Sequence, residues 1–199
     1  REDLPEGGPM STSSPEAVVI GTSAGALEAL SVILPALPAD FGLPIMVVVH
    51  IPPDKRSVLA ELFAAKCALN VVEAEDKVPL EAGTIYFAPP DYHLLVETDR
   101  SLALSADEPV LFSRPSIDVL FESAADIYGP GLIGIVLTGA NQDGALGLKA
   151  IADAGGIAIV QEPDTAFQDA MPEAAIKAVA KADILSLASI ATYLQKVEP

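Results

Sequence analysis

From residue 17 onward, short runs rich in β-branched residues alternate with segments in which apolar residues recur at helical spacing. This alternation is typical of a parallel sheet whose strands are joined by crossover helices. Residues 17–20 predict the first strand. Leu27, Leu30 and Leu34 then predict one buried face of the helix that follows. We therefore expect an α/β fold: a doubly wound, mostly parallel sheet with helices on both faces, in three layers.

The remaining elements follow the same two patterns along the chain. Further strands are predicted at residues 44–49, 71–74, 84–88, 131–139 and 157–161, and helices after Asp54, after Pro115, before Gly155-Gly156, at residues 172–182 and at residues 187–197. Residues 93–97 and 101–104 predict a small antiparallel hairpin, because a short turn joins them. The middle of the chain is therefore expected to be antiparallel or an insertion at the sheet edge.

Length and composition favour one domain with a sizeable core. The chain has 199 residues, of which 51% are hydrophobic and only 20% are charged. A composition of this kind suits a sheet that is buried on both faces. We expect residues 1–15 to be a leader, either a linker or a remnant of expression, and residues 16–197 to form the folded domain.

The formal net charge of −17 disfavours some classes of partner. It arises from 28 acidic and 11 basic residues, so general electrostatic binding to nucleic acid or anionic lipid is not expected. No apolar run reaches the roughly 20 residues that span a bilayer. The single cysteine, Cys67, rules out an internal disulfide, and we interpret it as a core thiol in a cytoplasmic protein.

Residues 21–25 form a G-x-S-x-G pattern between the first predicted strand and helix. Small neighbours allow a sharp turn that presents the hydroxyl of Ser23, and the helix N-terminus behind it offers free N–H groups to a developing oxyanion. A plain glycine-rich turn or a phosphate-binding loop is the alternative. No Gly-Lys-Ser/Thr follows and the Rossmann glycine spacing is absent, which weakens the phosphate and cofactor interpretations.

A serine that is activated by an imidazole base must use one of the two histidines of this chain, His50 or His93. His50 ends the second predicted strand, which we expect beside the first, so it would lie near Ser23. A histidine at a strand end can also be a hydrogen-bonded structural residue. His93 begins a hairpin strand, and we interpret it as structural or as part of a cleft rim, with the base role as its alternative.

Residues 137–144 carry a third polar strand end, which enters a loop flanked by Gly139 and Gly144. Asp143 in this loop could accept the N–H of the far nitrogen of a catalytic histidine, which would fix its tautomer. Its alternative role is to cap the helix that follows. Ligands gather at the carboxyl ends of strands in open parallel sheets, so Ser23, His50 and Asp143 are expected to meet there.

Several motifs together resemble those of the chemotaxis protein-glutamate methylesterases. They are residues 20–25 (IGTSAG), 49–53 (VHIPP), 88–93 (APPDYH), 114–121 (RPSIDVLF), 137–144 (LTGANQDG) and 171–174 (MPEA), in that order. The resemblance spans about residues 18–194. It identifies the chain as similar to a family with a doubly wound α/β catalytic domain.

The resemblance implies a serine hydrolase that removes methyl esters from receptor glutamates and, in some members, deamidates receptor glutamines. It matches Ser23, His50 and Asp143 to the catalytic triad, and the backbone N–H groups of Ala24 and Ala140 to the oxyanion hole. No metal or organic cofactor is implied. The implied partners are the cytoplasmic helices of chemoreceptors, with no direct membrane insertion and with a response regulator or a receiver domain outside this chain.

The chain departs from the family pattern at Ala26, where a second glycine is usual, and at residues 140–142, where Met-Gly-Asn is usual. These departures affect the expected shape of the cleft. Two other functions remain as alternatives: an α/β-hydrolase that acts on small esters, and a non-catalytic receptor-binding module of the same fold. The former predicts the order Ser, acid, His, whereas both histidines here precede Asp143.

Overall fold

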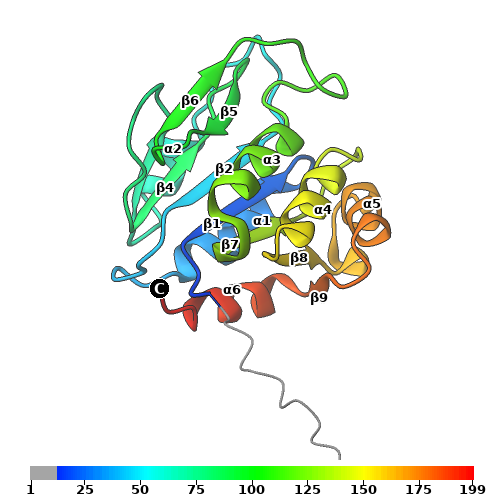
Figure 1. Cartoon of the computed structure of the whole chain (residues 1–199). Helices are drawn as coiled ribbons and strands as arrows, with labels where there is room; N and C mark the ends of the chain where they lie inside the picture. Colours follow the sequence, from blue (N-terminus) through cyan, green and yellow to red (C-terminus); the bar gives the residue numbers. More distant parts are fainter. Residues whose placement is uncertain (1–12) are drawn as a thin grey trace, which may run out of the picture.

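The computed structural model describes residues 13–199, so residues 1–12 of the predicted leader lie outside the described residues. A seven-stranded parallel sheet forms its centre, in the order β3-β4-β2-β1-β7-β8-β9 (Figure 1). Its strands are β1 (Ala17–Thr22), β2 (Ile45–Val49), β3 (Asn70–Glu73), β4 (Thr84–Phe87), β7 (Leu132–Val136), β8 (Ile157–Gln161) and β9 (Asp183–Leu185). The separate antiparallel hairpin consists of β5 (His93–Val96) and β6 (Leu102–Ser105).

Helices cover both faces of the sheet. They are α1 (Ala26–Ile33), α2 (Leu59–Ala64), α3 (Ile117–Tyr128), α4 (Ala145–Asp153), α5 (Ala170–Ala178) and α6 (Leu187–Gln195), with short 3-10 turns at Leu34–Ala36, Gly129–Gly131 and Pro163–Thr165. Alternate residues of a strand point to opposite faces. Val18 and Ile20 pack into the core beneath α1, α2 and α6, whereas Ala17 and Val19 pack with α3, α4, α5 and the hairpin. The predicted three-layer, mostly parallel α/β fold is confirmed.

The central strands are buried along their whole length. All residues of β2 (IMVVV) and β7 (LIGIV) are apolar, and every residue of β1, β2 and β7 is buried. A strand with helices on both faces requires such a run. The registers Thr22↔Val49 and Gly21↔Val136 set the carboxyl ends of these three strands side by side.

The order of the strands reverses between β1 and β7, because the chain proceeds from β1 to β2 on one side and from β7 to β8 on the other. Crevices at such reversal points are the usual ligand sites of open α/β sheets. Gly21 allows the first turn of α3 to pack closely over this point. A Cβ atom on Gly21 would lie 2.3 Å from Cγ2 of Ile117.

Four local expectations are wrong. β3 and β4 are parallel members of the main sheet, whereas β5 and β6 pair antiparallel in a small sheet of their own. Helix α2 begins at Leu59 with Val58 at its N-cap, whereas Asp54 lies in the preceding loop. The strand β9 was not expected. Leu27 is 44% exposed, because the buried stripe of α1 runs instead through residues Ala26, Ala29, Leu30 and Ile33.

No helix within residues 13–199 combines the length and the apolar character needed to cross a membrane. Cys67 is half-buried beside the apolar core beneath α1, α2 and α6. Burial raises the pKa of its thiol. A thiol of this kind is less reactive than an exposed one.

Candidate active site

Ser23 directly follows β1 in a tight turn that leads into α1. Gly25 adopts a left-handed conformation with φ of 86°, which a residue without a side chain accommodates readily. The backbone N–H of Ser23 donates to the carbonyl of Thr138 at 3.0 Å, and the hydroxyl of Thr22 donates to the same carbonyl at 2.7 Å. The end of β1 is therefore tied to the segment after β7.

Thr138 anchors the loop that faces Ser23. Its hydroxyl donates to the carbonyl of Ala24 at 2.8 Å and accepts from the N–H of Gln168 at 2.9 Å. Its own N–H donates to the side-chain oxygen of Gln161 at 2.9 Å. These bonds fix Thr138, which directly precedes Gly139. They therefore hold the backbone of residues 139–140 close to Ser23.

Ala140 and Ala24 carry the two backbone N–H groups expected to form an oxyanion hole, and Ala24 directly follows Ser23 in the chain. The N–H of Ala140 donates to Ser23 Oγ at 3.2 Å. The N–H of Ala24 donates to no acceptor within residues 13–199. Gly139 brings this loop close: a Cβ atom there would lie 2.6 Å from Met171 Sδ and 2.8 Å from Ser23 Oγ. Backbone N–H groups beside a nucleophile are donors of the kind that an oxyanion requires.

His50 follows β2 and lies beside Ser23 in the sheet register. Its backbone N–H donates to the carbonyl of Thr22 at 3.2 Å, and its side chain is 14% exposed. Ring atom Nε2 lies 2.7 Å from Oδ2 of Asp143, which leaves Nδ1 as the other ring nitrogen. Among the described residues, no hydrogen bond joins His50 to Ser23 Oγ. Catalytic contacts of this kind are often longer without substrate.

Asp143 is fully buried and accepts several hydrogen bonds besides that from His50. The N–H groups of Ile117 and Asp118 donate to it at 2.7 and 2.9 Å, and the hydroxyl of Ser116 donates at 3.0 Å. Burial by itself would raise the pKa of Asp143, but the bonds from His50 and from these backbone groups hold the pKa below its ordinary value. The carboxylate is therefore ionised at neutral pH.

A carboxylate near the start of each of the helices α3 and α4 accepts hydrogen bonds from the start of the other helix. Asp143, which precedes α4, accepts from the first turn of α3, and Asp118 of α3 accepts from the N–H groups of Gly144 and Gly147 at 2.9 and 2.7 Å. The alternative role of Asp143 as a cap of the following helix is therefore wrong, because Asp118 accepts the N–H groups at the start of α4 instead. Burial, reinforced by the charges of Asp143 and Glu122, raises the pKa of Asp118 to about 6.

His93 supports the start of α3 from the hairpin. It is 2% exposed, and its Nδ1 accepts the N–H of Ser116 at 3.1 Å while Nε2 lies 2.9 Å from the carbonyl of Glu108. An acceptor Nδ1 and a donor Nε2 describe a neutral ring. Both ring nitrogens are thus occupied by the loop that precedes α3.

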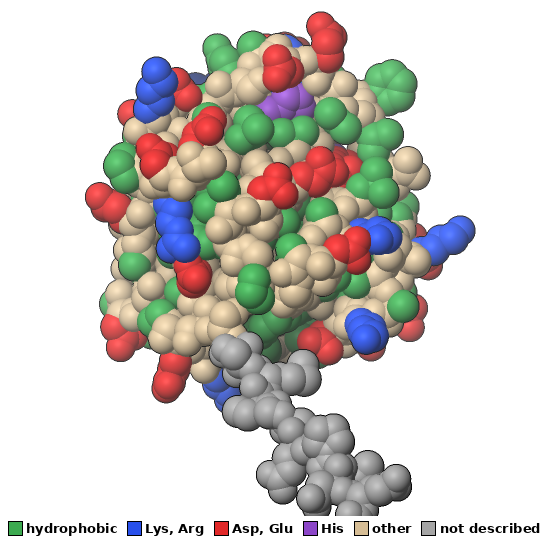
Figure 2. Space-filling view, in the orientation of Figure 1, with side chains coloured by type: hydrophobic (Ala, Val, Ile, Leu, Met, Phe, Trp, Pro, Cys, Tyr) green, Lys and Arg blue, Asp and Glu red, His purple; other side chains and the backbone are tan. Residues whose placement is uncertain are grey.

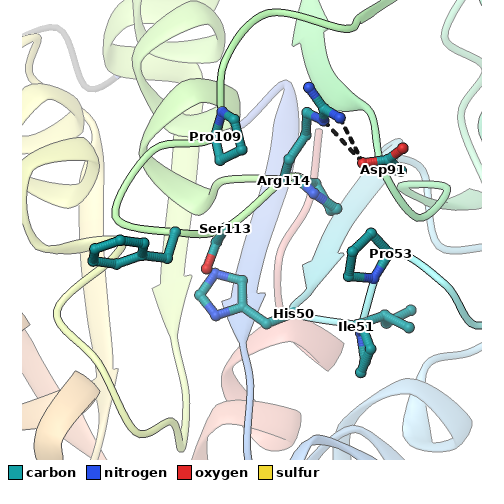
Figure 3. Close-up of a pocket in the computed structure, with 10 residues that line it drawn as sticks. His50, Ile51, Pro53, Asp91, Pro109, Ser113 and Arg114 are labelled. Carbon is teal, nitrogen blue, oxygen red and sulfur yellow. Dashed lines mark hydrogen bonds and ion pairs between the residues drawn. The ribbon is translucent and has the colours of Figure 1, made fainter.

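A cavity of about 340 Å³ opens beside His50 (Figure 3). Pro53 and Asp91 lie on one side of it, and the side chain of Ser113 points toward the His50 ring. Arg114 closes the far wall, where its guanidinium donates twice to Asp91, at 2.7 and 3.1 Å. Since this arginine is already paired, the cavity offers a largely apolar wall instead of a free cation.

Sequence patterns alone did not single out Thr138, Gln161, Ser116 or Asp118 as site residues. The motif at residues 114–121 contained Ser116 and Asp118 without a role for either. Only the folded chain brings their polar atoms to the loops of Ser23 and Asp143. Within residues 13–199, no group of three or more His, Cys, Asp or Glu could hold a metal ion.

Comparison with known proteins decides the family. The family model described as CheB methylesterase matches residues 18–194. The chain belongs to the CheB methylesterase family. A crystal structure of the Thermotoga maritima CheB methylesterase catalytic domain is similar to this chain, with a TM-score of 0.88 and 33% sequence identity over 94% of this chain and all of that one.

Relatives within the CheB methylesterase family are of different lengths. A Leptospira interrogans protein, provisionally named protein-glutamate methylesterase/protein-glutamine glutaminase, is 49% identical over 92% of this chain and 95% of its own length. A protein of Archaeoglobus fulgidus with the same enzyme name is 39% identical over 80% of this chain but only 47% of its own length. The chain spans about half of this longer relative. The predicted family resemblance is confirmed.

Proposed function

We propose that this chain is a serine esterase that hydrolyses the methyl esters of glutamate side chains in chemoreceptors and releases methanol. One observation carries the proposal: the hydroxyl of Ser23 meets the N–H of Ala140 at the point of strand reversal where His50 is bonded to Asp143. A nucleophile, an amide donor and an oriented imidazole are the parts that acyl transfer requires.

In the proposed first step, Ser23 Oγ attacks the ester carbonyl and His50 takes the hydroxyl proton. Nδ1 is the nitrogen that receives it, because Nε2 is engaged with Asp143. The N–H groups of Ala24 and Ala140 bind the oxyanion, and methanol leaves with the proton that His50 returns. Water then attacks the acyl-serine by the same route, which frees the glutamate and regenerates Ser23.

Asp143 keeps the imidazole in the tautomer that this chemistry needs. Its lowered pKa leaves a carboxylate at neutral pH, which accepts the N–H of Nε2 and stabilises the imidazolium that forms. The bonds from Ile117 and Asp118 hold this carboxylate in place. The imidazole therefore does not need to reorient before it accepts a proton.

The names of the relatives support a second reaction at the same site. Proteins named protein-glutamate methylesterase/protein-glutamine glutaminase act on glutamine as well as on methylated glutamate. Attack of Ser23 on a glutamine side chain would release ammonia in place of methanol. We propose chemoreceptor helices in the cytoplasm as the substrate for both reactions, and we propose residues 16–197 as the catalytic unit.

Methanol release from a methylated, radiolabelled receptor tests the proposal. We expect release by the wild type and loss of nearly all turnover in Ser23→Ala, whose small change leaves the fold intact. A serine-reactive phosphonate should label Ser23. Ser113→Ala is the matched control, because Ser113 also lies beside His50. Labelling at Ser113, or full turnover by Ser23→Ala, would contradict the assignment of the nucleophile.

A further inference from the structure

An exposed apolar dipeptide, Leu111-Phe112, lies at the tip of a tight turn. Val110 and Ser113 pair across this turn, with N–H···O distances of 3.0 and 2.8 Å in the two directions. Leu111 and Phe112 both have positive φ, at 48° and 64°. Two consecutive residues of this kind form the turn type in which Asn-Gly is strongly preferred.

The turn is unfavourable in two independent respects. A left-handed backbone strains residues that carry a Cβ atom, and here two bulky side chains adopt it in succession. In addition, Phe112 is completely exposed and Leu111 is 39% exposed. Within residues 13–199, neither side chain is therefore packed well enough to explain the choice of residues. A strained conformation that persists in this way points to a function.

The position of the Leu111-Phe112 turn connects it with the candidate active site. It belongs to the loop between β6 and α3, which projects beyond the body of the domain (Figure 1). Phe112 lines the same cavity as His50. Leu111 lines a neighbouring hollow of about 430 Å³ together with Leu146, which is 64% exposed. The apolar surface is thus continuous from the edge of the site to the start of α4.

A second exposed aromatic ring lies against the turn that follows Ser23. Phe167 is 75% exposed, and its Cβ atom lies only 2.7 Å from where a Cβ of Gly25 would be. Its neighbour Gln168 accepts the N–H of Gly139 at 3.1 Å. Apolar side chains therefore border the candidate site. A single glutamate ester bound at Ser23 would not contact them.

The charge of the molecule limits which contacts can hold the proposed substrate there. Acidic side chains are spread over the face shown in Figure 2, and a protein with a net charge of −17 repels an acidic polypeptide at long range. Short-range apolar contacts must then supply the affinity for a substrate segment that itself contains glutamates. On a helix, residues three or four positions from the ester-bearing glutamate share its face, so their apolar side chains can reach the border of the site while the ester reaches Ser23.

We propose that the Leu111-Phe112 turn is a docking element for the substrate protein, which binds apolar side chains of the receptor helix one turn from the ester-bearing glutamate. This inference rests on the proposed function, since it assigns the substrate segment of that same site. The turn contributes to recognition and takes no part in the bond-making steps. Small esters, which have no such neighbours, do not use it.

The double variant Leu111→Asn/Phe112→Gly tests the proposal without weakening the fold, because it introduces the dipeptide that this turn prefers. We expect its melting temperature to equal or exceed that of the wild type. Its kcat/KM for methylated receptor should fall about tenfold or more, mainly through a higher KM, as expected for loss of an aromatic anchor. Its kcat/KM for p-nitrophenyl acetate should change less than about threefold. Ile184→Ala, which removes an exposed side chain from β9, is the matched control.

Each other outcome has one meaning. If the wild type releases no methanol, the proposed function fails and the inference fails with it. If the wild type is active and the double variant equals it on methylated receptor, only the docking element is refuted. An equal loss on both substrates would also refute it, because the turn would then act on the catalytic centre. If the wild type is a dimer and the double variant is a monomer, the turn serves self-association, and this result would overturn the proposal.

Discussion

Replacement of Asp118 by asparagine should stabilise the protein at neutral pH. Oδ1 of Asp118 accepts the N–H groups of Gly144 and Gly147, and an asparagine oxygen can do the same. The substitution removes a buried charge that faces Asp143 and Glu122. Asp118 also borders the hollow of about 430 Å³ beside α4, where the new amide group can reach water.

The magnitude follows from the pKa of Asp118. A value of about 6 in the folded state, against 3.8 ordinarily, means that the folded protein binds the proton more tightly. The wild type therefore loses stability as pH rises from about 3.8 to about 6. The loss is at most about 3 kcal/mol, at about 1.4 kcal/mol for each pKa unit. The stabilising effect of Asp118→Asn should thus be near zero below pH 4 and reach a plateau above pH 6.

Urea unfolding of both proteins at pH 4, 5, 6 and 7.5 measures this effect. The expected signature is a difference in unfolding free energy that increases with pH and then levels off. Asp126→Asn is the matched control, because it removes an exposed carboxylate of the same helix that accepts no hydrogen bond from α4. A difference that is independent of pH, or an Asp118→Asn variant that is less stable at pH 7.5, would refute the reasoning.

Three further substitutions test the candidate site. Asp143→Asn should lower turnover by up to about 10⁴-fold through loss of the correct imidazole tautomer, and a loss below about threefold in the methanol assay would show that the carboxylate is not needed. Gly139→Ala should lower kcat/KM at least tenfold and destabilise by about 1–3 kcal/mol, because its Cβ would clash with Met171 and Ser23; unchanged kinetics would contradict this packing. Ser116→Ala should cost about 2 kcal/mol in thermal unfolding, since its hydroxyl donates to Asp143 and caps α3.

Strand and helix patterns predict most of this fold because the sheet is central and buried. The runs that became β1, β2 and β8 contain little besides apolar residues, so their identity does not depend on distant contacts. In contrast, β9 has three residues, two of them exposed, and it exists only because β8 offers an edge to pair with. Pairing direction is also non-local, which explains why the sequence leaves the middle of the chain as either antiparallel or an insertion at the sheet edge and does not predict the parallel pairing of β3 and β4.

The polar residues of the site also differ in whether the sequence predicts their place. The sequence could predict that Ser23, His50 and Asp143 gather at one edge of the sheet, because the first two directly follow strands and the third lies in the loop after β7. The residues that hold these three side chains in place could not be predicted. Asp118 looks like an ordinary first-turn acid of a helix, and nothing local indicates that its oxygen accepts N–H groups from the start of α4, the next helix along the chain. Asp54 likewise looks like a cap, yet the Pro52 carbonyl accepts from Lys55 in a turn before α2 begins.

The placement of β7 beside β1 has a consequence for how the protein folds during synthesis. The bond between His50 and Asp143 joins residues 93 positions apart, and the bond between Ala140 and Ser23 joins residues 117 positions apart. Contacts over such separations form late, because the intervening chain must first be ordered. During synthesis Ser23 and His50 emerge well before Asp143. A nascent chain thus holds Ser23 and His50 without the carboxylate that bonds to the histidine, so we expect hydrolysis only from the finished domain.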